Sequence, residues 1–401
     1  MTVLKKSISL PCGVTIHNRI AKSAMSENLS TNDNRINDTL INAYAEWAKG
    51  NAGILITGNI MVDSSALGEP LNVVVEDESQ MDLLVKWAES VKGFDSQLWA
   101  QINHPGRQAM EQINTVLKAP SAIPVHITGR KNASKKIPQA MTNEEIEECI
   151  ERFGNTAIIL KEAGFSGVQI HGAHGYLVNQ FLSPLTNIRT DKWGGSLENR
   201  ARFVLEIYDN IRAKVGDSFP VGIKLNSADF QKGGFTEEES MEIIKMLSKR
   251  KIDLIEISGG TYEAPAMMGS KKHSTKVREA YFLDFIEKAR KITKTPLMLT
   301  GGFRTVSVME EAIKDDNVDI IGLARPFAVF PHLSQEIFDE SIKELSFSHK
   351  KTGVKAIDAA LNLIWYEAQI KRIGQGKGPK LNLSPWLTFF KYVAAIIKKR
   401  S

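Results

Sequence analysis

The sequence predicts an α/β protein built on a single parallel barrel of eight strands with surrounding helices, the (β/α)8 or TIM barrel. Eight short apolar runs occur in order, and most lack polar alternation, as expected for strands buried on both faces. Segments with helical periodicity separate them, and this alternation of strand and helix favours a barrel over an open doubly wound sheet. No Gly-x-Gly-x-x-Gly motif directly follows a strand, as a dinucleotide-binding open sheet would require.

The elements follow one another in the order that such a barrel requires. The predicted strands are residues 19–25, 53–62, 97–104, 167–171, 221–227, 254–260, 296–302 and 320–326. The predicted helices lie at about residues 39–50, 80–92, 143–163, 198–214, 236–250, 281–292 and 306–314. Thr142 and Glu145 have the spacing of a capping box, which predicts the start of the third helix.

An insertion interrupts this alternation after the third strand. Residues 105–142 form a connection much longer than the ~15 residues of ordinary loops. Because insertions at the carboxyl ends of barrel strands surround the active site, we expect this segment to cap the substrate side. A surface hairpin without contact to a ligand is the alternative.

The barrel is expected to span residues 1–335, and residues 336–401 to form a helical extension packed on its outside. One helical face of the last part carries Trp386, Phe389, Phe390, Val393 and Ile397. Such a stripe favours packing against a core or a second subunit over a role at a membrane surface. The protein could therefore form a homo-oligomer through this face.

Composition argues against several classes of function. Lys and Arg number 51 and Asp and Glu 46, and residues 398–400 supply three of the five net positive charges, so no nucleic-acid partner is expected. Two cysteines, Cys12 and Cys149, are too few for a disulfide framework, a four-cysteine zinc site or a cysteine-ligated iron–sulfur cluster. The sequence shows no signal-peptide pattern and no apolar run long enough for a membrane span, so a cytoplasmic protein is expected.

Polar residues gather where the central strands end, and barrels place their chemistry at these carboxyl ends. Gln101 lies in the third strand, the fourth runs into His171, His174 and Tyr176, and the fifth carries Lys224.

Glycines and a basic residue follow the last two strands. Gly301 and Gly302 end strand seven, and Arg325 follows strand eight. Barrels most often bind phosphate at this place through backbone N–H groups, and an arginine adds a bidentate charged contact. The sequence therefore predicts a phosphate site here.

The cluster of His171, His174 and Tyr176 has four interpretations. Zinc binding needs a third ligand, for which His104 is the one obvious candidate. An aldolase would use Lys224 as a Schiff-base nucleophile, which leaves the histidines unexplained. The two imidazoles could instead polarise a substrate carbonyl while Tyr176 delivers a proton, or they could be ordinary hydrogen-bonded histidines.

The stretch from His171 to Arg200, HGAHGYLVNQFLSPLTNIRTDKWGGSLENR, resembles the signature of the old yellow enzyme family of flavin-dependent ene-reductases. Further pieces agree in chain order over about residues 5–335. They are Asn18-Arg19-Ile20, Gln101, His104-Pro105-Gly106-Arg107, Gly301-Gly302 and Ala324-Arg325-Pro326. The charged residues from Arg189 to Arg200 are interpreted as structural, as a loop that leads into a helix capped by Ser196.

This resemblance implies a cofactor and a reaction. The family binds FMN non-covalently at the carboxyl end of the barrel, takes hydride from NADH or NADPH, and passes it from flavin N5 to an activated alkene. Nicotinamide and the small-molecule substrate, an α,β-unsaturated carbonyl compound or enone, use one pocket in turn in a ping-pong cycle. No separate nucleotide domain is then needed.

The resemblance also implies roles for individual residues. His171 and His174 correspond to the donors to the substrate oxygen, and Tyr176 to the group that protonates the α-carbon. Gln101 corresponds to the residue that pairs with the flavin pyrimidine edge. Lys224 stands where a cation, more often arginine, lies beside N1 and O2.

Three further groups of residues correspond to cofactor contacts. The segment beside the isoalloxazine ring corresponds to Ser23, Ala24, Met25 and Ser26, with Ser26 where relatives often carry Thr or Cys. Gly58 matches a small residue that lets the ring approach. The phosphate cradle corresponds to Gly259, Gly301, Gly302, Ala324 and Arg325.

Other functions stay open on the sequence. The natural acceptor of such a flavin barrel could be a quinone, a dienoyl thioester or oxygen. A phosphate-binding lyase that uses Lys224, and a barrel that only binds flavin or a partner, are the other classes.

Overall fold

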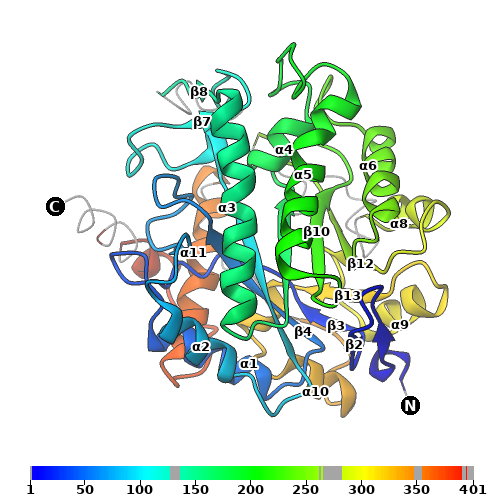
Figure 1. The fold of residues 1–401 in the computed structure, drawn as a ribbon. Helices are drawn as coiled ribbons and strands as arrows, with labels where there is room; N and C mark the ends of the chain where they lie inside the picture. The colour runs from blue at the N-terminus through cyan, green and yellow to red at the C-terminus, as the bar shows by residue number, and fades with distance from the viewer. Residues whose placement is uncertain are drawn as a thin grey trace.

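A computed structural model describes residues 2–126, 136–261, 263–264, 282–346, 355–390 and 394. A closed barrel of eight parallel strands lies at its centre (Figure 1). In chain order the strands are β3 (Ile20–Lys22), β4 (Ile54–Met61), β6 (Gln97–Asn103), β9 (Gly167–Gly172), β10 (Val221–Asn226), β11 (Leu254–Ser258), β12 (Leu297–Thr300) and β13 (Ile320–Leu323). The barrel closes because β3 pairs with both β13 and β4. The predicted fold class is confirmed.

Helices surround the barrel at the predicted places. They are α1 (Asp38–Ala48), α2 (Met81–Glu89), α3 (Asn143–Glu162), α5 (Leu197–Val215), α6 (Glu237–Lys249), α8 (Leu283–Arg290) and α9 (Val306–Lys314). Figure 1 shows α3 and α5 side by side, and the two helices are in contact. Thr142 and Glu145 form the predicted capping box of α3, and Ser196 caps α5.

The amino-terminal end of the barrel is filled by apolar side chains. A hairpin of β1 (Ile8–Ser9) and β2 (Thr15–Ile16), which the sequence analysis missed, packs Leu10 and Ile16 against the inward-facing Trp99 and Met298. Trp99 fits inside because Gly167 stands on the neighbouring strand, where a Cβ would lie 2.7 Å from the indole ring. The packed end leaves the carboxyl end for binding.

The insertion after β6 contains the helical turn η2 (Gly106–Gln108) and a small parallel pair, β7 (Lys118–Ala119) and β8 (Gln139–Ala140). Arg189, from the loop before α5, donates hydrogen bonds to the carbonyl oxygens of Pro120 and Met141 and pairs with Asp191. This loop thus ties the insertion to the barrel, in line with its structural interpretation.

The chain beyond the barrel contains α10 (Leu333–Phe338) and α11 (Lys355–Gly374), and the predicted domain boundary at residue 335 falls inside α10. Helix α11 packs on α1 and on the turn η4 (Arg325–Ala328). The contact with α1 is close, since a Cβ on Gly374 would lie 1.9 Å from the carbonyl oxygen of Thr39.

The predicted apolar stripe near the C-terminus does not face the core where it is described. Trp386 is 40% exposed and Phe390 is 64% exposed, whereas Phe389 is half-buried; the buried residue of this helical turn is Thr388. Packing of the stripe against a second subunit stays a prediction. Val393 and Ile397 lie outside the described residues. Within the described ranges, no helix has both the length and the apolar character needed to cross a membrane.

Candidate active site

A cavity of about 580 Å³ lies at the carboxyl ends of the barrel strands. It brings together most of the residues that the sequence predicts for the site. The predicted residues in its lining are Ala24, Met25, Ser26, Gln101, His171, His174, Tyr176, Lys224, Gly301, Gly302, Ala324 and Arg325. Its volume is in the range of cofactor and small-molecule sites.

Ser23, Gly58 and Gly259 lie next to this cavity without lining it. The Ser23 hydroxyl is 2.8 Å from the Thr300 hydroxyl. A Cβ on Gly58 would lie 2.5 Å from the Met25 carbonyl oxygen, so close packing against that segment already requires glycine there. A Cβ on Gly259 would likewise meet two phenylalanine rings at 2.8 Å. Contact of these three residues with a cofactor stays a prediction.

His171, His174 and Tyr176 converge at one end of the cavity. The His171 ring lies edge-on to both others, with centroids 5.1 Å from His174 and 4.8 Å from Tyr176. His174 adopts a left-handed backbone conformation, with φ of 61°, which is unusual for a residue other than glycine. The Asn226 side chain stabilises this turn, since its Oδ1 accepts the backbone N–H of His174 at 3.2 Å.

Burial lowers the pKa of both imidazoles. Desolvation, together with His174 and Lys224, holds the pKa of His171 well below its ordinary value of 6.5. Desolvation and then Lys224 lower the pKa of His174 to about 3. Both rings are therefore neutral at pH 7, and each carries one N–H.

Hydrogen bonds indicate where the ring protons lie. Nδ1 of His171 accepts the backbone N–H of Ala173 at 3.4 Å, which places the proton on Nε2. Nε2 of His174 lies 2.7 Å from the Ser258 hydroxyl. If Ser258 donates in this contact, the other nitrogen of His174 carries the proton and can donate into the cavity.

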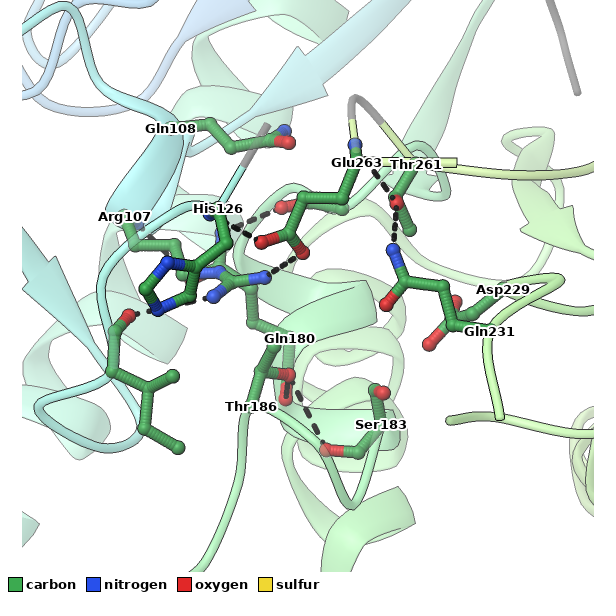
Figure 2. Close-up of polar contacts among 12 residues, drawn as sticks. Arg107, Gln108, His126, Gln180, Ser183, Thr186, Asp229, Gln231, Thr261 and Glu263 are labelled. Atoms are coloured by element: carbon green, nitrogen blue, oxygen red, sulfur yellow. Dashed lines mark hydrogen bonds and ion pairs between the residues drawn. The ribbon is translucent and has the colours of Figure 1, made fainter. Parts of the chain in front are cut away.

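The insertion after β6 braces the turn that carries His174. Gln108 Nε2 donates to the carbonyl oxygen of His174 at 3.0 Å. The neighbouring Arg107 forms a buried ion pair with Glu263, whose other oxygen accepts the backbone N–H of His126 (Figure 2). No described residue of the insertion lines the cavity, so its role as a cap stays a prediction.

The metal interpretation finds no support in the described part of the chain. His104 uses its Nδ1 to accept the backbone N–H of Gly106 at 3.0 Å, and burial lowers its pKa to about 4. The described residues contain no group of three His, Cys, Asp or Glu side chains arranged to hold a metal ion.

The part of the cavity lined by residues after β12 and β13 has the features of a phosphate site. Gly301 and Gly302 have φ of 126° and 93°, a backbone conformation that favours glycine. Arg325 lines this part, and so does Arg304, which the sequence analysis did not select. Its position two residues after the glycine pair is a signal that could have found it.

A buried polar network includes Gln101 and Lys224, which line the cavity. Gln101 Nε2 donates to Gln169 Oε1 at 2.7 Å, and Gln169 Nε2 donates to Glu256 Oε2 at 2.7 Å. The ammonium of Lys224 is 3.0 Å from Glu256 Oε1. Gln169 and Glu256 are not predictable as site residues from the sequence, because both lie inside predicted strands.

Ser26 contacts two buried carboxyl groups, Glu69 and Glu367. A hydroxyl has one proton, so both contacts are hydrogen bonds only if one of the carboxyl groups is protonated. Desolvation raises the pKa of both glutamates, and Glu69 raises the pKa of Glu367 further. The raised pKa values favour a proton within this pair, beside the cavity that Glu69 lines.

The residues of this cavity fit FMN. Glycines of positive φ and two arginines suit the phosphate, while an amide and an ammonium group suit the polar edge of the pyrimidine ring. The Asn59 side chain, opposite Gln101 in the pairing of β4 with β6, also lines the cavity. Its buried Oδ1 has no hydrogen-bond partner in the described part of the chain, and a ligand could supply one.

Comparisons with known proteins support FMN as the cofactor. The NADH:flavin oxidoreductase / NADH oxidase family matches residues 8–344. The NADH-dependent flavin oxidoreductase iccE of Talaromyces variabilis is 35% identical over 410 residues, which cover 93% of this chain and 98% of that protein.

Solved structures agree as well. A complex of 2-naphthoyl-CoA reductase with 2-naphthoyl-CoA is 31% identical with a TM-score of 0.78, over 84% of this chain and 52% of that one. An old yellow enzyme homologue from Zymomonas mobilis, 24% identical, shares the fold with a TM-score of 0.72 over 85% of this chain and 93% of that one. The chain thus belongs to the NADH:flavin oxidoreductase / NADH oxidase family, the old yellow enzymes, and is an NAD(P)H-dependent flavin oxidoreductase with FMN as its cofactor.

Proposed function

We propose that this enzyme reduces the activated C=C bond of α,β-unsaturated carbonyl compounds, with NADH or NADPH as the hydride donor. The observation that carries the proposal is the convergence of His171, His174 and Tyr176 at one end of the cavity. Neutral imidazoles are suited to donate hydrogen bonds to an oxygen on which negative charge develops.

Each of the three side chains has a distinct part in this proposal. Nε2–H of His171 and a ring N–H of His174 bind the carbonyl oxygen and orient the alkene. Tyr176 holds the proton that goes to the α-carbon, as a general acid. FMN, when bound, supplies the hydride acceptor and donor of the cycle.

The proposal also places the cofactor. Gln101 and Lys224 would meet the pyrimidine edge of the flavin, and the segment 23–26 would lie along the ring. Gly301, Gly302, Ala324 and Arg325 would hold the phosphate. The presence of all these residues except Ser23 in the lining of one cavity supports this placement.

Anaerobic kinetics test the proposal. NADH or NADPH should bleach the yellow holoenzyme, and cyclohexenone should then restore the oxidised flavin spectrum in a stopped-flow experiment. Flavin that is reduced by nicotinamide but never reoxidised by a panel of enones would contradict the proposed substrate class.

A second candidate acceptor is an unsaturated or aromatic thioester. It is favoured by the 31% identity to the structure of 2-naphthoyl-CoA reductase bound to 2-naphthoyl-CoA, although this chain covers 52% of that protein. Faster reoxidation by an enoyl or aryl thioester than by the matching ketone, in the same experiment, would select this candidate.

A further inference from the structure

Glu256, on β11, is a carboxylate with 0% exposure that belongs to the network beside the cavity. Three groups contact it: Lys224 at 3.0 Å, the Thr300 hydroxyl at 2.6 Å and Gln169 Nε2 at 2.7 Å. All three are donors, so both carboxylate oxygens act as acceptors. A buried charge requires partners of this kind.

This carboxylate determines which way the neighbouring amides point. Because Glu256 accepts only, Gln169 must turn its NH2 group toward it and its carbonyl oxygen toward Gln101. Gln101 must then donate its own NH2 group to Gln169. A flip of Gln169 would place its oxygen against the carboxylate, so the carboxylate fixes both amides. The carbonyl oxygen of Gln101, which lines the cavity, is left to accept a hydrogen bond from a ligand.

The same carboxylate offsets the charge of Lys224. The Lys224 side chain is 4% exposed and reaches the cavity, and Glu256 lies on the adjacent strand in register with it. The pair presents less positive charge to a ligand than a lone ammonium group would, because opposite charges at this distance largely cancel in a buried environment.

We propose that Glu256 is a positioning residue for the flavin, which fixes the hydrogen-bond polarity of Gln169 and Gln101 and offsets the charge of Lys224. The inference rests on the proposed placement of the ring against Gln101 and Lys224. Glu256 then lowers the midpoint potential of the bound FMN and favours a flavin with a hydrogen on N3.

The charge part is tested by the midpoint potential of the holoenzyme in a double-mutant cycle. Glu256→Gln should shift the potential to a more positive value, because uncompensated Lys224 stabilises the reduced, negatively charged flavin. Lys224→Met should shift it to a more negative value, and in that background Glu256→Gln should lose its effect. Asp253→Asn is the matched control, since Asp253 forms a buried ion pair with Arg212 at the amino-terminal end of the barrel and should leave the potential unchanged.

The polarity part is tested by flavin binding to the apoprotein. The wild type should bind FMN at least ten times more tightly than 3-methyl-FMN, and Glu256→Gln should narrow this ratio, because a glutamine at 256 lets the two amides rotate. Gln169→Leu, which leaves the Lys224–Glu256 pair intact, should narrow the ratio without the positive shift in potential. This second variant keeps the test available if Glu256→Gln does not fold.

The outcomes separate the inference from its premise. If Lys224→Met leaves the potential unchanged and the wild type does not distinguish the two flavins, the proposed ring placement fails and the inference fails with it. Suppose instead that Lys224→Met lowers the potential and the wild type prefers FMN to 3-methyl-FMN, as the ring placement requires. If Glu256→Gln then changes neither the potential nor the ratio of the two flavin affinities, the role of Glu256 is overturned while the placement stands.

Discussion

At the scale of single residues, the site depends on side chains kept neutral by burial. His171 and His174 line a cavity wall that desolvates them, so they serve as hydrogen-bond donors rather than as cations. Their grouping with Tyr176 is predictable from sequence, because all three residues lie within six positions at the end of one strand and in the turn after it. The protonation state of the two histidines is not predictable from sequence, because it depends on Lys224 and on burial by distant segments.

Tyr176→Phe should separate the two halves of the catalytic cycle. Reduction of the flavin by NADH should proceed at the wild-type rate, whereas reoxidation by an enone should slow by roughly 10²- to 10⁴-fold, because the proton donor is lost. Stopped-flow absorbance measures both steps. Equal slowing of the two steps would contradict the role of proton donor.

Replacing both His171 and His174 by alanine should abolish the binding of phenols to the oxidised holoenzyme. In the wild type, this binding should show no histidine titration between pH 5 and 8, because the pKa values of both imidazoles lie far below 6.5. Absorbance titration at several pH values measures the affinity. A step in affinity near pH 6.5 would show that the rings charge in the working range.

At the scale of elements, the strands and helices of the barrel repeat were predictable, and the short elements outside that repeat were not. Each of the eight strands overlaps its predicted range, and the predicted helices appear within a few residues. The hairpin of β1 and β2 and the six-residue helix α4 (Leu177–Leu182) were missed, because two-residue strands and a helix of under two turns show no distinct periodicity. Their positions are set by tertiary contacts, such as the packing of Ile16 in the barrel.

Gly167→Ala should destabilise the barrel. The added methyl group would lie 2.7 Å from Trp99 inside a packed interior, and such overpacking costs roughly 1–3 kcal/mol. Urea unfolding with saturating FMN measures the loss. Trp99→Phe removes part of the indole ring, so Gly167→Ala should cost less in that background; an equal cost in both would show that Trp99 is not the obstacle.

At the scale of the whole molecule, the cavity depends on segments far apart in sequence. Glu367, on α11, reaches Ser26 across 341 positions, and Leu363 of the same helix lines the cavity. The sequence predicts that this segment is helical, but it does not predict what α11 packs against. No local signal specifies the partner of a buried glutamate. Trp386 and Phe390 are exposed in the single chain, so packing against a second subunit is the part of that prediction that stays open.

Glu367→Gln should change how stability depends on pH. In the folded state the pKa of Glu367 lies well above its ordinary value of 4.5. Between these two pKa values the unfolded chain has lost this proton while the folded chain keeps it. The free energy of unfolding of the wild type therefore falls as the pH rises above 4.5. Glutamine does not ionise, so the variant lacks this pH-dependent decrease. Its free energy of unfolding minus that of the wild type should increase from pH 5 to pH 9.

Chemical unfolding at several pH values measures this difference. Glu89→Gln, on the exposed end of α2, is the control and should show a constant difference. A constant difference for Glu367→Gln as well would mean that its carboxyl group is charged in the folded state at all these pH values.

The reach of α11 to Ser26 also bears on the order in which the protein is made. Ser26 is synthesised early, and Glu367 follows 341 residues later. The cavity therefore lacks the part of its lining that α11 supplies for most of translation. We therefore expect the cavity to take its final form, and to bind FMN tightly, only after α11 has been synthesised.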